Sequence, residues 1–148
     1  MLQTDVWLVG WQVEEDHLDL TIGERMAWDT IPMDEDWVTE LFADRRRIPL
    51  ALDTYADATR APEDPSWVRI SGTVERIERI TAEFVQSDAP TDPGLVAVPG
   101  SARSRSVSSL RHRPVGAGSA VGFVVRIAGP GTGREARGGV ATSLPSGV

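Results

Sequence analysis

The chain is 148 residues long, which fits one domain built around a single hydrophobic core. It contains no cysteine, and this excludes a disulfide framework, a thiol nucleophile and any Cys-ligated zinc or iron–sulfur centre. Its formal net charge is −7, but residues 1–99 hold almost all of the Asp and Glu side chains, whereas residues 100–148 are basic. Charge blocks of one sign are typical of tails and interaction surfaces rather than of a core.

The N-terminal part of the chain predicts strands. Residues 6–13 are apolar on both alternating faces, which is typical of a buried strand, and the acids at 14–16 are expected to turn the chain. Residues 18–22 alternate between apolar and polar, which indicates a strand with one solvated face. A tight turn is expected at residues 23–24, and a further strand at residues 25–28.

One amphipathic helix is predicted to begin at residues 33–36. Asp34 is a suitable N-cap, the acids beside it favour the positive end of the helix dipole, and the arginines at 45–47 favour the negative end. An edge strand is predicted at residues 48–52, because Pro49 has no N–H to donate to a ladder. The apolar stripe of the helix consists of Trp37, Val38, Leu41 and Phe42.

The middle of the chain gives an exposed loop and then a long extended segment. Residues 56–66 predict the loop, and residues 67–74 alternate as a strand does. In residues 75–85 the apolar side chains are spaced three or four apart, which suits a helix or a bulged and bent strand. We favour the bulged strand, because Gly72 and the β-branched residues around it lead into this segment without a turn signal.

The last third predicts one long loop, one strand and a tail. Residues 86–119 are rich in Pro, Gly, Ser and Arg, and a loop of that length is usually functional or disordered. Residues 121–127 predict the strand that closes the domain, with Phe123 in the core. We therefore expect one domain over residues 1–128 and a disordered tail over residues 129–148, which holds nothing to build a core.

Two segments resemble known strand pairs. Residues 22–28 and 71–77 look like the Gly-acid-x-apolar and Gly-x-Val-x-x-Ile strands of small SH3-like barrels. Residues 5–127 also resemble a group of small uncharacterised proteins from high-GC bacteria, in which a Val-Trp strand runs into a Trp-Gln pair and a Gly-aromatic-x-Val strand closes the domain. The resemblance implies a mainly β fold, with α+β as the margin: a small SH3-like β-barrel with one inserted helix and no assigned activity.

One cluster mixes a histidine with carboxylates. Oxygen-rich groups of this kind can bind a divalent cation, but this spacing matches no defined metal loop. We therefore interpret the cluster as a solvated turn and predict no metal. Its members are Glu14, Glu15, Asp16, His17 and Asp19.

The chain offers little for catalysis. Its two histidines are His17 and His112, and no acid stands near His112 to orient it toward the neighbouring serines. The glycine-rich segment 129–135 lacks the Lys that a phosphate-binding loop needs. We predict no cofactor, and we favour a protein that is not an enzyme.

One basic patch lies in the long loop. It could attract phosphate backbones, but no aromatic residues interleave with it for base stacking. We expect it to contact the acidic body or a protein partner instead, so nucleic acid is disfavoured. The patch consists of Arg103, Arg105, Arg111 and Arg113.

The leading hypothesis is a non-enzymatic, cytoplasmic module that binds a protein or a small ligand. We expect neither a signal peptide nor a membrane span, and the oligomeric state is left open. The alternative is a metabolite-binding barrel or enzyme with its site at one mouth, and nucleic-acid binding is weaker still. The candidate ligand-binding residues are Trp11, Gln12, Glu14, His17 and Trp67.

Overall fold

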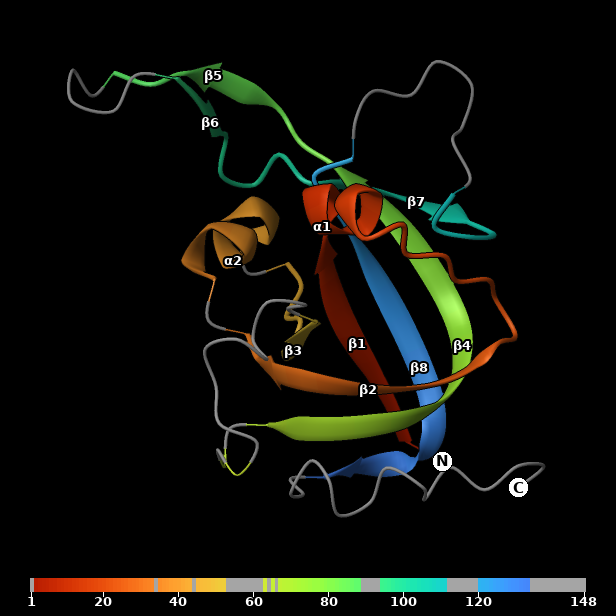
Figure 1. Cartoon of the computed structure of the whole chain (residues 1–148). Coiled ribbons are helices and arrows are strands. Elements are labelled where there is room, and N and C mark those ends of the chain that lie inside the picture. Colours follow the sequence, from red (N-terminus) through yellow and green to blue (C-terminus); the bar gives the residue numbers. More distant parts are fainter. Residues whose placement is uncertain are drawn as a thin grey trace.

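The computed structural model describes residues 2–33, 35–43, 45–52, 63, 65, 67–88, 94–111 and 120–133. Most of this part of the chain is extended (Figure 1). The elements in chain order are β1 (Leu2–Val9), α1 (Gly10–Glu15), β2 (Arg25–Pro32), α2 (Asp36–Phe42), β3 (Leu50–Leu52), β4 (Val68–Thr81), β5 (Phe84–Gln86), β6 (Leu95–Ala97), β7 (Arg103–Val107) and β8 (Gly122–Gly133).

Five strands close into a barrel. They follow the order β2-β3-β1-β8-β4, and β4 pairs back onto β2 to complete the ring. The β1–β3 pair is parallel and every other pair in the ring is antiparallel. The predicted small β-barrel with an inserted helix is therefore confirmed, while its SH3-like character stays a prediction.

Strand β4 bends, and it therefore pairs with different neighbours along its length. Its first half pairs with β2 and its second half with β7, while β8 runs alongside both halves. The register to β8 shifts between Ser71 and Thr73 and again between Val74 and Arg76. A bulge adds one residue and reverses the inward alternation, which explains why Val74 and Ile77 both lie in the barrel core although they are three apart. The bulged strand, and not the helix, is the correct interpretation of this segment.

The bend brings two strands into very close approach at Gly72. Its φ is +153°, and a Cβ placed there would lie 2.3 Å from the carbonyl oxygen of Ala128. A Cβ on Gly129 would lie equally close to the carbonyl oxygen of Ser71. Both glycines are therefore required for β4 and β8 to cross at this distance.

We predict that Gly72→Ala lowers the free energy of unfolding by about 3 kcal/mol or more, because it combines an unfavourable φ with a backbone clash. Gly23→Ala is the matched control, since Gly23 also has a positive φ (+98°) but nothing within 4 Å of its Cβ position. The control should cost only about 1 kcal/mol. Equal urea midpoints for the two variants would contradict the close-approach argument.

Apolar side chains form two clusters, one on each side of the barrel wall. The inner cluster fills the barrel and includes Val6, Ile77 and Val125. The outer cluster lies beneath α2, where Trp7 contacts the ring of Trp37 edge-on at a centroid distance of 6.0 Å. Because both faces of β1 are covered, its sequence is apolar at consecutive positions.

Helix α2 agrees with its prediction except at its ends. Glu35 occupies the N-cap position, Asp34 lies outside the described residues, and the helix ends at Ala43 with φ 46°. Strand β3 is not an edge strand as predicted, since it lies between β2 and β1. Pro49 precedes the strand, so no ladder bond is lost, and its carbonyl accepts a hydrogen bond from the Met33 N–H at 2.8 Å.

Several other boundaries differ from the prediction. The first strand stops at Val9, because residues 10–15 leave the sheet as α1, and residues 18–22 form only an isolated bridge from Thr21 to Ser109. The predicted loop over residues 86–119 contains β6 and β7, and β8 continues past Ala128 to Gly133. Three predicted features lie outside the described residues: the loop at 56–66 apart from residues 63 and 65, His112, and the tail beyond residue 133.

Candidate functional site

Helix α1 covers one end of the barrel, where β1 ends and β8 begins (Figure 1). The Gly10 N–H donates to the Val121 carbonyl at 2.9 Å, which fixes the start of the helix against β8. At its other end His17 adopts φ 53°, and the Leu18 N–H donates back to the Val13 carbonyl at 3.0 Å. This left-handed ending returns the chain toward the barrel and sets Leu18 against the inner cluster.

A cavity of about 490 Å³ lies between α1 and the barrel interior, and we call it the mouth cavity. Its walls are apolar where they meet the inner cluster, at Val13, Leu110 and Phe123. Four polar side chains also line it: Glu14, His17, Arg79 and Arg111. An apolar wall with a few convergent polar groups is the usual composition of a small-molecule site.

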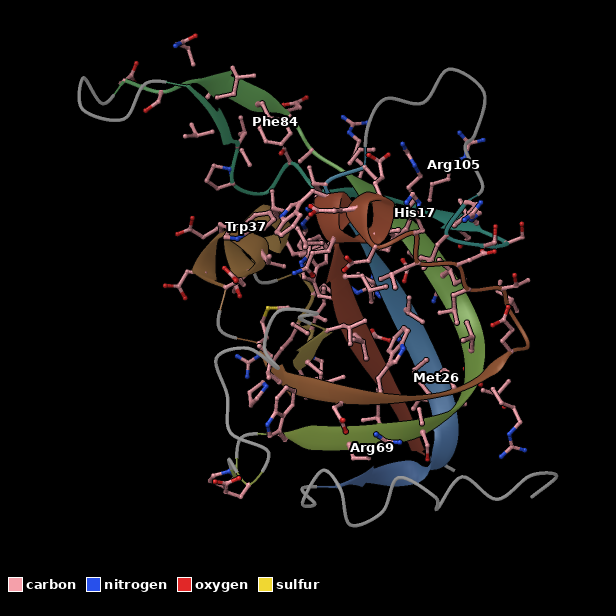
Figure 2. The ribbon with its side chains drawn as sticks, viewed as in Figure 1. His17, Met26, Trp37, Arg69, Phe84 and Arg105 are labelled. Carbon is pink, nitrogen blue, oxygen red and sulfur yellow. The ribbon has the colours of Figure 1, made fainter. Side chains whose placement is uncertain are left out.

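Arg79 is the most deeply placed of these polar groups. It lies on β4 two residues after the inward-facing Ile77 and opposite Phe123 of β8, so its side chain points to the barrel interior. It is only 6 % exposed, whereas Glu14, His17 and Arg111 are exposed at the rim. Figure 2 shows His17 at this end of the barrel and Arg69 at the opposite end.

The structure brings together two of the five candidate ligand-binding residues. Glu14 and His17 line the mouth cavity. Trp11 projects from the same helix with about half of its surface exposed, and Gln12 is buried, but neither lines the cavity. Trp67 is buried in the outer cluster.

The cavity is also lined by Arg79, Leu110 and Phe123, which no sequence pattern predicts as site residues. Phe123 was predicted only as core, which it also is. Arg79 is two residues after Ile77, so the two share a face of β4. The sequence cannot show that this face points inward, because the bulges before Ile77 decide it.

The predicted basic patch is not one loop. Arg103 and Arg105 are exposed on β7, which pairs with β4. Arg111 follows at the cavity rim, where its Nε lies 3.6 Å from Asp19 Oδ2. Arg113 lies outside the described residues.

A second charged cluster lies on the outer face of the barrel, and we call it the outer ion network. Arg46, in the segment after α2, binds both Glu78 carboxylate oxygens, with Nη2–Oε1 at 2.6 Å and Nη1–Oε2 at 2.9 Å. Its Nη2 also lies 3.2 Å from Asp5 Oδ2. Arg126 completes the network, with its Nε 2.9 Å from Asp5 Oδ1.

Ionisation in the outer ion network is strongly coupled to folding. Burial alone would raise the pKa of Asp5, but hydrogen bonds from Arg126 and Arg46 outweigh it and lower that pKa. Glu78 behaves in the same way, with burial opposed and exceeded by the Arg46 guanidinium, so its pKa is also lowered. The network ties the segment after α2 to β1 and β4, which is a structural role.

We predict that Arg46→Met lowers the free energy of unfolding by about 2–3 kcal/mol at pH 7, because the buried Glu78 carboxylate loses its two-point contact with Arg46 and Asp5 keeps only Arg126. Arg47→Met, at the exposed neighbouring position, should change it by no more than about 0.5 kcal/mol. Urea denaturation of both variants measures the difference.

The same pair of proteins tests the pH dependence. The pKa values of Asp5 and Glu78 are lower in the folded state than in the unfolded state, where they are about 4, so both groups stabilise the fold above that pH. This stabilisation is lost as the pH falls through the folded-state pKa values. The deficit of Arg46→Met should therefore narrow as the pH falls from 6 toward 3.5. A deficit independent of pH would show that Arg46 stabilises through packing alone.

Metal-ligand clusters and membrane-spanning helices are both absent from the part of the chain that the structure describes. No three His, Asp or Glu side chains in this part of the chain are grouped so that they could hold a metal ion. Neither of its helices has the length and apolar character needed to cross a bilayer.

The fold and the site together define a small closed β-barrel with a ligand-sized cavity at one mouth. The chain belongs to a family of unknown function, DUF6578, whose model matches residues 2–129 and so covers every barrel strand except the end of β8. No curated protein matches the chain, and no solved structure matches it.

Proposed function

We propose that this chain is a cytoplasmic, non-enzymatic binding module that holds a small molecule in the mouth cavity. The mouth cavity carries the proposal, because its volume of about 490 Å³ is that of a site for a small organic ligand. Its apolar wall belongs to the inner cluster, so the site is supported by the closed barrel and needs no rearrangement to form. Catalysis by Glu14 and His17 is the alternative use of the same cavity, and it would appear as turnover of a bound ligand.

The first test uses two fluorescent probes, neutral Nile red and anionic 8-anilinonaphthalene-1-sulfonate. At least one should bind the folded chain with a stoichiometry of one. Ala120→Trp places an indole ring in the mouth cavity and should weaken that binding by at least tenfold. Glu24→Trp adds the same ring at an exposed turn outside the cavity and should leave it unchanged.

Two outcomes would contradict the proposal. The first is that neither probe binds a chain that circular dichroism shows to be folded. The second is that a probe binds Ala120→Trp as tightly as it binds the unsubstituted chain. Binding with a stoichiometry well above one would also count against a single built site.

A separate observation supports protein binding as a second candidate function. Strands β5 and β6 form a two-stranded sheet that projects from the barrel, and we call residues 83–88 and 94–98 the arm (Figure 1). Val85 and Val96 pair on one face, and Phe84 lies on the other. Each of these side chains is over 40 % exposed, and Leu95 is 68 % exposed. Isolated two-stranded sheets are marginally stable, and clustered exposed apolar side chains mark interaction surfaces.

The charge of the arm indicates the kind of partner. Between Thr81 and Arg103 the chain has acids and no cation, and Glu83 and Asp88 are exposed on the arm. A second copy of this acidic chain would bring like charges together. We therefore propose a partner protein with an apolar groove and a basic rim. Nucleic acid, through Arg103 and Arg105, remains the weaker alternative, because the rest of the chain is acidic.

We predict that Phe84→Ser/Leu95→Ser folds normally, since both side chains are exposed, but loses partner binding. A photo-crosslinking residue at Val96 identifies the partner in source cells, and the purified pair is then compared by calorimetry. The double variant should weaken binding by at least tenfold, and added salt should weaken binding of the unsubstituted chain. Ile22→Ser, an exposed apolar residue away from the arm, is the control. Crosslinking only to a second copy would contradict this choice of partner.

A further inference from the structure

The mouth cavity contains one deeply buried charge, that of Arg79. A guanidinium that is nine-tenths buried is costly to remove from water unless it is paired. Arg79 has its contacts within the fold, yet a guanidinium carries five N–H donors in a planar fork. It can therefore keep those contacts and still bind an oxyanion from the cavity side.

A second arginine lies directly opposite the first. In the β4–β7 ladder Arg79 pairs with Arg105. This pair lies two residues along the ladder from the pair of Ile77 and Val107, which both belong to the inner cluster. Alternate residues of a strand share a face, so Arg105 lies on the same face of the sheet as Arg79. Arg105 is exposed and stands beside the cavity rather than in its lining. Figure 2 places Arg105 at the same end of the barrel as His17. Like charges at directly opposed positions destabilise a sheet, and an anion bound between them would relieve that repulsion.

The acidic groups near the mouth do not reverse this polarity. Glu14 lines the cavity at its exposed rim, while Glu15 and Asp16 are exposed and do not line it. Asp19 lies 3.6 Å from Arg111, and both side chains are more than half exposed, so that pair is weak. Among the residues that the structure describes, the most deeply placed charge at the apolar wall is thus positive.

From this arrangement we infer that the mouth cavity binds a small organic anion, an inference that rests on the proposed small-molecule function. The apolar part of the ligand would pack against Phe123 and Leu110. Its carboxylate or phosphate would be bound by Arg79 inside the cavity, with Arg105 reaching it from the exposed edge, because guanidinium groups match both oxyanions in a bidentate geometry.

The test begins with ligands that differ only in their head group. 8-Anilinonaphthalene-1-sulfonate, an anion on an apolar ring system, should bind with a stoichiometry of one and at least tenfold more tightly than neutral Nile red. Octanoate or octyl phosphate should displace it, whereas octan-1-ol and octylamine should do so at least tenfold less well. The ratio of the octanoate and octyl phosphate constants shows which oxyanion the site prefers.

The variants assign the effect to the two arginines. Arg79→Met and Arg105→Ser should each weaken binding of the sulfonate probe by about tenfold or more, as expected for losing a charge-assisted hydrogen bond. Arg25→Ser, an exposed arginine on β2, should leave it unchanged. Arg105 is exposed, so its variant tests the inference even where Arg79→Met fails to fold.

The outcomes separate this inference from the function on which it rests. If Nile red binds at the cavity as well as the sulfonate probe does, the binding module stands and the anion is wrong. Unchanged affinity for the sulfonate in Arg105→Ser, or in folded Arg79→Met, would likewise overturn the inference and leave these arginines a structural role. If neither probe binds, the binding function itself fails.

Discussion

The close crossing of β4 and β8 at Gly72 is the constraint on which the rest of the structure depends. β4 must pair with β2 at one end and with β7 at the other, and only a bent strand reaches both. The bend requires two register shifts against β8 and a backbone approach that excludes a Cβ. Without it the β2–β4 pair could not form, and the sheet would remain open with two unpaired edges.

The bulges also determine which side chains face inward after the bend. Beyond the second shift, Ile77 and Arg79 point into the barrel, while Glu78 and Ile80 point outward. The outward pair is covered by α2 and by Arg46 from the segment that follows it. A backbone irregularity near Gly72 thus places one charged residue in the mouth cavity and its neighbour in the outer ion network.

The sequence was informative where burial is simple. The apolar run of β1, the closing strand β8 and the apolar stripe of α2 could be predicted because each buries a recognisable face. α1 could not, since Val13 continues the apolar alternation of β1 and only the contact of Gly10 with Val121 shows that the chain has left the sheet. β7 escaped prediction because four of its five side chains are exposed arginine or serine.

The candidate site was harder to predict, because the burial of its central residue depends on contacts between distant parts of the chain. Glu14 and His17 stand out as the mixed cluster in the sequence, and both do line the cavity. Arg79 lies in a segment of β4 where pairs of charged residues separate the apolar ones, and it looks like part of a solvated strand face. Its burial follows from long-range pairing with β7 and β8, which no local pattern encodes.

The charge near the mouth cavity differs in sign from the net charge of the chain. A chain of formal charge −7 repels a small anion on average, but that repulsion is screened beyond about 10 Å at moderate ionic strength. Close to the cavity the field is set by its nearest groups, and low-dielectric apolar walls concentrate it. Arg79 is fixed between two strands, so its position does not depend on the ligand. An acidic surface with cations gathered at one mouth would therefore discourage anions elsewhere and admit them at a single place.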